Sequence, residues 1–132
     1  MQRQSFEVTG LEHENPIPAV CRKGNVLVSS GIFGAVPAPG VSAKERQVPP
    51  AIEEEAAQMF RNMRTVIEAA GGSVHDIVSV SIWVTDRAYK PLVNKPWLEM
   101  FPDPHSRPTR DTDEVPKLSH GCRMRCKFIA VV

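Results

Sequence analysis

The sequence has few aromatic residues and almost no net charge. Aromatic side chains make up 6% of the 132 residues, and the formal charge is +1, with acidic and basic residues mixed along the chain. Proteins that bind single-stranded nucleic acid combine a basic groove with aromatic stacking platforms, so this composition argues against a nucleic-acid partner. The length fits one domain, which we expect to span residues 1–132.

Long apolar runs and a disulfide framework are also missing. No stretch approaches the roughly 20 apolar residues that cross a bilayer, and the polar segment 1–4 does not resemble a signal peptide. The three cysteines, Cys21, Cys122 and Cys126, are an odd number, which is atypical of a secreted disulfide scaffold. We therefore expect a cytoplasmic protein with reduced thiols and no membrane partner.

One group of residues suggests a metal site. His120, Cys122 and Cys126 would all point to one side of an extended strand. In such a strand the Cα atoms of the two cysteines lie roughly 13 Å apart, too far for a disulfide and too far for one ion. We expect no bound metal.

The clearest helix prediction begins after Pro49-Pro50. Glutamates at 53–55 suit the positive end of a helix dipole, and Gly71-Gly72 ends the pattern. Apolar residues recur between them at spacings of three and four: Ile52, Ala56, Met59, Phe60, Met63, Val66, Ile67 and Ala70. These spacings predict an amphipathic helix that covers a sheet.

A second helix is predicted after Thr85-Asp86, which supply capping side chains. Its apolar positions are Tyr89, Leu92, Val93, Trp97, Leu98 and Phe101. Pro96 is costly inside a helix, so we expect a kink or a restarted helix near Asn94.

Alternating segments predict the strands. In 77–85 the residues Val78, Val80, Ile82 and Val84 share one side, and in 122–132 the apolar side carries Cys122, Met124, Cys126, Phe128 and Ala130, with Arg123, Arg125 and Lys127 opposite. A short edge strand at 4–8 and a hairpin across 19–33 precede them. The order predicts an α+β layer, with two helices on one face of a mixed sheet.

The other face of this sheet is expected to carry a mixture of Ser79, Ser81, Trp83, Arg125 and Lys127. That mixture favours an oligomer that partly buries the face and has polar pockets between subunits. The segment 34–50 is predicted to be a loop, either covering a binding site or forming a passive surface excursion.

Arg110 is the leading candidate for a binding residue. It follows Pro108-Thr109 in the stretch 106–112, and its guanidinium forms a planar fork that matches a carboxylate. The alternative is an ion pair with Asp111, Asp113 or Glu114 at the surface.

Six short segments, in order, resemble the Rid family (reactive intermediate deaminase, YjgF or endoribonuclease L-PSP). They are Gly24-Asn25 with Val28-Ser29-Ser30-Gly31, the run from Asn62 to Gly71, the run from Val80 to Asp86, Asn94, Phe101, and Pro108-Thr109-Arg110. The resemblance implies a chorismate-mutase-like domain with a mixed six-stranded sheet, assembled as a homotrimer with ligand clefts between subunits. It also implies hydrolysis of imines and enamines to ketoacids and ammonia, a hydrolase acting on C–N bonds without a cofactor.

Some site residues of the family are matched in this chain, and others are replaced. Arg110 matches the arginine that binds the substrate carboxylate, and Ser30 and Gly31 match the strand-end pair beside it. Where the best-known branch has a tyrosine, a cysteine and a water-directing glutamate, this chain is assigned Ile17, Thr112 and Lys127. An ammonium group donates hydrogen bonds and accepts none, so it does not replace a carboxylate directly.

These departures leave several functions open. Arg110 and Lys127 side by side would favour a ligand with more than one carboxylate, and Lys127 would be pushed toward its neutral form, able to act as base or nucleophile. Lys127 paired with an aspartate or a neighbouring subunit is the alternative. The predicted function is hydrolytic deamination of a small carboxylate-bearing metabolite, with Thr112 or a lysine-bound water replacing the glutamate. A non-catalytic regulatory trimer that binds small acids is the second reading, and a ribonuclease or translation inhibitor the third.

Overall fold

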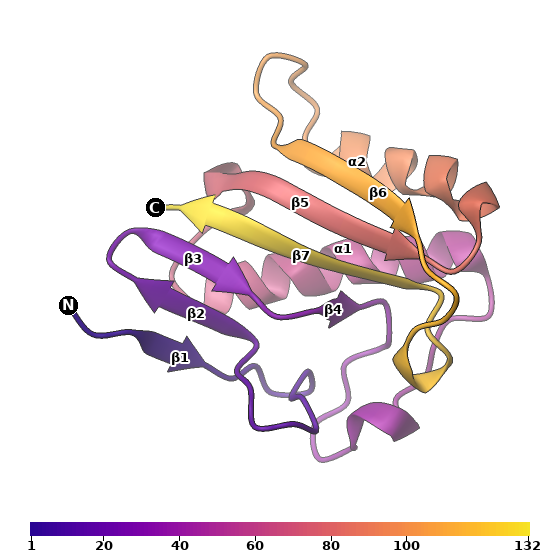
Figure 1. Ribbon diagram of the computed structural model, residues 1–132, viewed down its shortest axis with the longest axis horizontal. Coiled ribbons are helices and arrows are strands. Elements are labelled where there is room, and N and C mark those ends of the chain that lie inside the picture. The colour runs from indigo at the N-terminus through magenta and orange to yellow at the C-terminus, as the bar shows by residue number, and fades with distance from the viewer.

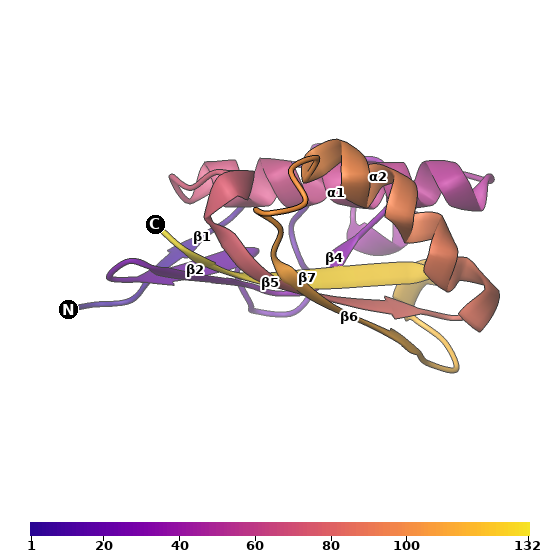
Figure 2. The ribbon, with the colours of Figure 1, turned by 90° about the horizontal axis from the view of Figure 1, so that it is seen from above.

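The computed structural model describes all 132 residues and contains one mixed sheet with both helices on the same face (Figure 1, Figure 2). The strands are β1 (Gln4–Phe6), β2 (Val20–Lys23), β3 (Val26–Ser29), β4 (Ile32–Phe33), β5 (Ile77–Val84), β6 (Thr109–Glu114) and β7 (Met124–Val131). Their order is β1-β2-β3-β7-β5-β6, with the short β4 also paired to β7. The sheet therefore has seven strands rather than the six predicted, because the two-residue β4 pairs separately.

Most neighbouring strands are antiparallel, and β5 and β6 form the one parallel pair. The parallel pair is possible because the chain between β5 and β6 crosses the sheet through the second helical region. The predicted hairpin is confirmed: Gly24 turns the chain between β2 and β3 with φ of 62°, a conformation that glycine adopts without strain.

The predicted long helix is confirmed as α1 (Ile52–Ala69). Its buried stripe includes Met59, Phe60, Met63 and Ile67, each at most 3% exposed. Gly71 has φ of 83°, and the Gly72 amide donates to the Ile67 carbonyl at 3.0 Å, which closes the C-terminal end of the helix.

One residue of α1 departs from this apolar pattern. Glu55 is fully buried, and its carboxylate accepts hydrogen bonds from the amide of Arg123 at 2.7 Å, from Nε of Arg123 at 2.7 Å and from the amide of Met124 at 3.1 Å. Arg123 also donates through Nη2 to the carbonyl of Pro49 at 2.7 Å. Our prediction that Arg123 points away from the helices is therefore wrong, because the chain before β7 turns this side chain toward the start of α1.

The second helical region restarts where the sequence predicted. Asp86 accepts a hydrogen bond from the amide of Ala88 at 2.9 Å and opens the 3₁₀ helix η3 (Arg87–Val93). A new helix, α2, then covers Asn94–Met100. Pro96 falls in its first turn, where the missing N–H leaves no hydrogen bond unmade.

β5 contains an irregularity that the alternation did not reveal. Its pairing with β7 shifts register between Ile77 and Ser79, so one extra residue, Val78, is inserted. Val78 is consequently 48% exposed, whereas Val80, Ile82 and Val84 are buried as predicted. Placing Val78 with the buried valines was wrong, since a bulge changes the side of the sheet that a residue faces.

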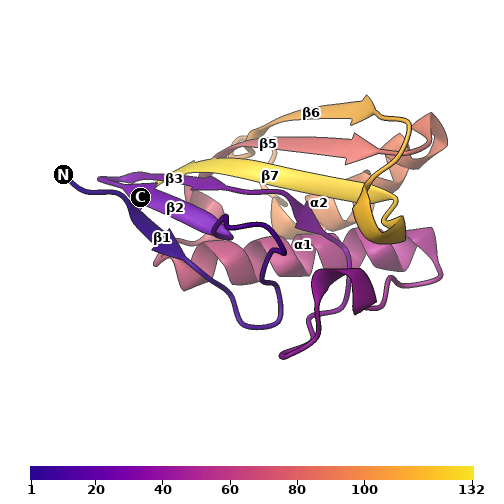
Figure 3. The ribbon, with the colours of Figure 1, turned by 60° about the horizontal axis from the view of Figure 1, so that its bottom comes forward.

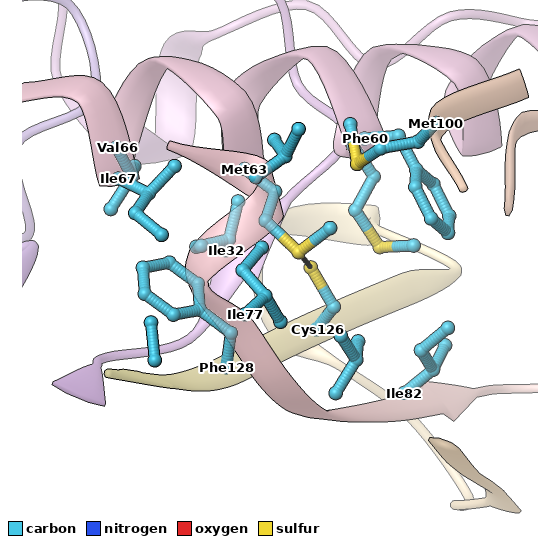
Figure 4. Packing of buried hydrophobic residues seen from close by; sticks show 14 of the residues in the cluster. Ile32, Phe60, Met63, Val66, Ile67, Ile77, Ile82, Met100, Cys126 and Phe128 are labelled. Carbon is cyan, nitrogen blue, oxygen red and sulfur yellow. Dashed lines mark hydrogen bonds between the residues drawn. The ribbon is translucent and has the colours of Figure 1, made fainter. Parts of the chain in front are cut away.

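The core lies between the helices and the sheet (Figure 4). Phe128, Ile82 and Cys126 of the sheet meet Met63, Phe60 and Ile67 of α1 there, and Cys126 Sγ lies 4.0 Å from Met63 Sδ. The apolar side predicted for β7 is confirmed, with Cys122 just before the strand also buried. No helix of the chain combines the length and apolar character needed to cross a bilayer.

Candidate functional site

Apart from Lys127, the residues predicted to form the site fall into two groups within the chain. Arg110 and Thr112 lie on the edge strand β6, where they pair with Val80 and Ile82 of β5. Because paired residues share a face of the sheet and Val80 and Ile82 are buried, both side chains face the helices. Ile17 and Gly31 instead line a cavity beside β4.

Arg110 is held by the second helical region. Its Nη2 donates a hydrogen bond of 2.8 Å to Oδ1 of Asn94, and its guanidinium carbon lies 4.9 Å from the ring centre of Trp97. No carboxylate pairs with it, so the predicted alternative of a surface ion pair with Asp111, Asp113 or Glu114 does not occur within the chain. Partial burial lowers the pKa of the Arg110 guanidinium.

Thr112 stands two residues further along the same face. Its Oγ1 is shielded from solvent and has no hydrogen-bond partner in the chain. A buried hydroxyl without a partner is unusual and marks a position where a ligand or an ordered water completes the hydrogen bond. Arg110, Thr112 and Asn94 therefore form one polar group, which we call the β6 cluster.

The second group surrounds a cavity of about 300 Å³, a size suited to a small metabolite. Its walls come from residues 11–19, from Gly31 to Ala35, from the loop 34–50 and from the 3₁₀ helix η4 (Ser119–Gly121). Figure 3 shows these segments gathered at the end of the sheet that carries β4. The loop thus borders a cavity, and it includes the 3₁₀ helix η1 (Ala43–Glu45) that the sequence did not predict.

Ser30 and Gly31 lie where β3 ends and β4 begins. The amide of Ser30 donates to the carbonyl of Ala19 at 3.0 Å, whereas the amide of Gly31 and the hydroxyl of Ser30 have no partner in the chain. A Cβ at Gly31 would lie 2.8 Å from Cδ of Arg125, so a side chain at this position would displace Arg125. Two free donors therefore lie at the border of the cavity.

The cavity also contains charged residues that the sequence did not single out. Arg46, from the loop, lies 3.4 Å from Glu12, and the Arg46 side chain is only 7% exposed. His13 makes a 3.0 Å hydrogen bond to the carbonyl of Gly31 through Nε2, while its Nδ1 is buried without a partner. Because a carbonyl accepts, Nε2 carries a proton in this contact.

These residues escaped prediction for a simple reason. His13, Arg46 and Arg125 are far apart in the sequence, and none belongs to a motif. A weak signal existed for Arg125 alone, because the alternation of β7 placed it on the side away from the core. Which loop residues would face it was not visible in the sequence.

Lys127 belongs to neither group. It pairs with Ser81 on β5, and Ser81 pairs with Asp111 on β6, so all three occupy the face of the sheet opposite the helices. Arg110 faces the helices, so the two cations predicted to lie side by side point to opposite faces of the sheet within one chain. Lys127 does not line the cavity.

His120 and the cysteines lie differently from the predicted strand. His120 has φ of 61° inside η4, and its Nε2 lies 4.0 Å from Glu14. Burial raises the pKa of the Cys122 thiol to about 11, with a further contribution from the nearby charge of Glu55, and burial also raises that of Cys126. All three cysteines are free thiols, and the two buried ones stay protonated at neutral pH.

Solved structures share this arrangement over nearly the whole chain. The YjgF gene product from Escherichia coli superimposes with a TM-score of 0.83 at 25% identity, covering 97% of this chain and 98% of that one. RidA from the Antarctic bacterium Psychrobacter gives a TM-score of 0.85 at 22% identity, over 98% of each chain. The fold is thus the α+β fold of the YjgF and L-PSP proteins.

Sequence relatives specify the family. Residues 11–132 match the family described as endoribonuclease L-PSP, and the chain belongs to this family, also called Rid or YjgF. The chain is 32% identical to the 2-iminobutanoate/2-iminopropanoate deaminase of Dermatophagoides farinae, over 89% of this chain and 86% of the relative. It is 30% identical to the protein of the same name from Escherichia coli K12, over 82% and 80%. These relatives support a deaminase function of the Rid type in general.

Proposed function

We propose that the protein hydrolyses a small imine that carries a carboxylate, or its enamine tautomer, and that Arg110 binds this carboxylate. Water adds to the imine carbon and protons move to the nitrogen. The C–N bond then breaks, leaving a ketoacid and ammonia. The observation that carries the proposal is the state of Arg110: a guanidinium oriented by Asn94 and Trp97, partly shielded from water, with no carboxylate of its own.

A fixed guanidinium favours a carboxylate for two reasons. Its fork makes two parallel hydrogen bonds, and its orientation is already fixed before the ligand arrives, so less conformational entropy is lost on binding. Thr112, two residues away on the same face, offers a hydroxyl that orients the attacking water or the imine nitrogen. The unpaired donors of Ser30 and Gly31 hold the reacting end of the substrate.

The two groups of residues meet only if a second copy of the chain takes part. Within one chain β5 and β7 separate β6 from β4, so the β6 cluster and the cavity lie apart along the sheet. We therefore propose a homotrimer in which the β6 cluster of one subunit borders the cavity of its neighbour. An exposed apolar patch on the open sheet face, formed by Val26, Val28, Val78, Ile129 and Val131, supports a contact between copies.

The test uses an imine that a second enzyme generates in the assay. A lyase that eliminates water from serine releases an enamine in situ, and the ketoacid is followed with a coupled dehydrogenase at low lyase concentration. We expect ketoacid release above the uncatalysed rate, and its loss in Arg110→Ala. Release at the uncatalysed rate with the unaltered protein would refute hydrolysis. Release that survives Arg110→Ala would remove Arg110 from the mechanism.

A regulatory trimer that binds small acids without turnover is the second candidate. It is favoured by the state of the carboxylates in the cavity, since Glu12 is paired with Arg46 and Glu14 with the amide of Lys44 and with His120. None is therefore free to activate water. Binding of small acids that depends on Arg110, together with no acceleration of imine hydrolysis, would select this candidate.

A further inference from the structure

We infer that Arg125 binds a second anionic group on the substrate, so that the preferred imine is one derived from a dicarboxylic amino acid. This inference rests on the proposed hydrolysis and adds the class of substrate. The sequence predicted Lys127 as the second cation of the site. In the structure Arg125, and not Lys127, is the basic residue of β7 that lines the cavity.

Arg125 is held against the strand end that carries the free donors. Its Cδ would be 2.8 Å from a Cβ on Gly31, so its stem lies directly over this glycine. Its guanidinium carbon lies 4.6 Å from the ring centre of Trp83, which fixes the plane of the guanidinium by stacking. The side chain is thus ordered and close to the place where the reacting end of the substrate is proposed to bind.

The Arg125 guanidinium makes no hydrogen bond and no ion pair within the chain. Its Nε is shielded from solvent and has no acceptor, and no carboxylate lies within ion-pair distance of Arg125. Arg123, two residues earlier in the chain, differs in this respect because it is paired with Glu55. A shielded nitrogen donor without a partner is costly in the free protein, so an incoming anion is favoured.

The other charges around the cavity are already paired. Glu12 accepts hydrogen bonds from the amide of Gly10 at 2.9 Å and from Arg46 at 3.4 Å. Glu14 accepts from the amide of Lys44 at 3.3 Å and faces His120. Neither carboxylate is therefore available to neutralise Arg125, which remains the unpaired charge of the cavity.

Basic residues also lie beside the cavity. A shallower depression that adjoins it is lined by Lys117, Leu118, Ser119, His120 and Arg125, and no acidic residue contributes to it. An anionic group that leaves the main cavity on this side meets the cations of Lys117 and Arg125. This surface attracts negatively charged ligands and guides them toward Arg125.

Two separated cations discriminate strongly between substrates. Arg110 binds the carboxylate next to the imine carbon, which every amino-acid-derived imine possesses. Arg125 is satisfied only by a ligand with another acidic group, and an uncharged side chain would bury the guanidinium without a partner. A substrate with an uncharged side chain therefore binds more weakly, because it leaves the Arg125 guanidinium without a partner.

The experiment compares two imines made in situ by flavin-dependent amino-acid oxidases, one from aspartate and one from alanine. The unaltered protein is expected to have a kcat/KM about tenfold or more higher for the aspartate-derived imine. In Arg125→Gln the ratio of the two kcat/KM values should fall about tenfold or more, toward one, with partial recovery in Arg125→Lys. Arg64→Gln is the matched control, because Arg64 is exposed on α1 and has no ion-pair partner.

A binding measurement separates this inference from the proposed function. Calorimetry with succinate and with propionate should show tighter binding of succinate, and Arg125→Gln should abolish the difference. Equal rates on both imines and equal binding of both acids would overturn the inference while leaving hydrolysis intact. If the protein hydrolyses neither imine but still prefers succinate in a way that depends on Arg125, the proposed hydrolysis is refuted. The second anion site would then stand.

Discussion

Arg110 donates a 2.8 Å hydrogen bond from Nη2 to Oδ1 of Asn94, which ties the edge strand β6 to the first residue of α2. Together with the Trp97 ring, this contact fixes the orientation of the Arg110 guanidinium at the edge of the sheet. The proposed carboxylate site thus depends on the restart of a helix 16 residues earlier in the chain.

The first prediction concerns this orienting contact. In Asn94→Ala the guanidinium keeps its charge but loses its fixed position, so binding weakens in ground state and transition state alike. We expect KM to rise about tenfold with little change in kcat. Steady-state kinetics with the in situ imine measure both constants. Lys95→Gln, an exposed neighbour on α2, serves as control. An unchanged KM in Asn94→Ala would show that the contact does not orient Arg110.

The second prediction concerns the buried carboxylate of Glu55. Glu55→Gln removes the charge that three donors of Arg123 and Met124 share, and it leaves Arg123 without its partner. We expect the free energy of unfolding to fall by about 3 kcal/mol. Urea unfolding at constant m-value measures the loss.

An exposed ion pair on the same helix provides the comparison. Glu54 and Arg61 lie 2.6 Å apart, and each side chain is more than half exposed. Glu54→Gln should therefore change the free energy of unfolding by no more than about 0.5 kcal/mol. Equal losses in the two variants would contradict a special role for the buried carboxylate.

The third prediction concerns Asn62, which is 1% exposed. Its Nδ2 donates to the carbonyls of Phe33 and Ala35, both at 2.8 Å, at the point where the loop 34–50 leaves the sheet. Asn62→Ala leaves both carbonyls without this donor, so we expect a loss of about 2 kcal/mol in the free energy of unfolding. Gln58→Ala, which removes the donor to Oδ1 of Asn62 and an exposed acceptor for Arg61, should cost less. A larger loss in Gln58→Ala would contradict the assignment.

The fourth prediction concerns alkaline pH. The pKa of the Cys122 thiol rises from 9.0 to about 11 on folding, so the unfolded chain ionises first as the pH increases. Stability from this group is complete below pH 9 and is lost as the pH rises toward 11. Urea unfolding at several pH values should show a shallower alkaline decline for Cys122→Ala. An identical decline in both proteins would contradict the shift.

The fifth prediction concerns assembly. Val28 lies opposite Ile129 in the centre of the apolar patch on the open sheet face. Val28→Glu places a charge there, so we expect a trimer to become a monomer and imine hydrolysis to be lost with it. Light scattering coupled to gel filtration measures the mass. Thr65→Glu, at an exposed position on α1, should leave the mass unchanged. A Val28→Glu protein that keeps both its mass and its activity would place the subunit contact elsewhere.

Patterns within a few residues of sequence correctly predicted the helices. The three- and four-residue spacing from Ile52 onward, the capping aspartate Asp86 and the helix restart at Asn94 each have a cause within a few residues, and each is confirmed. Val78 was misplaced because a bulge depends on the register with β7, which is a partner about 50 residues away. Arg123 was misplaced because its partner, Glu55, lies on the far side of the core.

The candidate site was predictable only in part, for the same reason. Arg110 stood out because it belongs to a motif, but its contacts with Asn94 and Trp97 depend on how α2 folds back over β6. The cavity brings residues 11–19 against Arg125, which are about 100 positions apart. No periodicity in the sequence encodes that proximity.

The segment 34–50 is fastened at both ends, and between them the Ala38 amide donates to the Gly10 carbonyl and Arg46 pairs with Glu12. Asn62 holds the carbonyl of Ala35, and Arg123 holds that of Pro49, while a Cβ on Gly40 would meet nothing within 4 Å. Insertions or deletions around Gly40 would therefore leave the core undisturbed while reshaping one wall of the cavity. Homologous proteins that diverge in length at this point are expected to differ in the size of metabolite they accept, with the scaffold beneath unchanged.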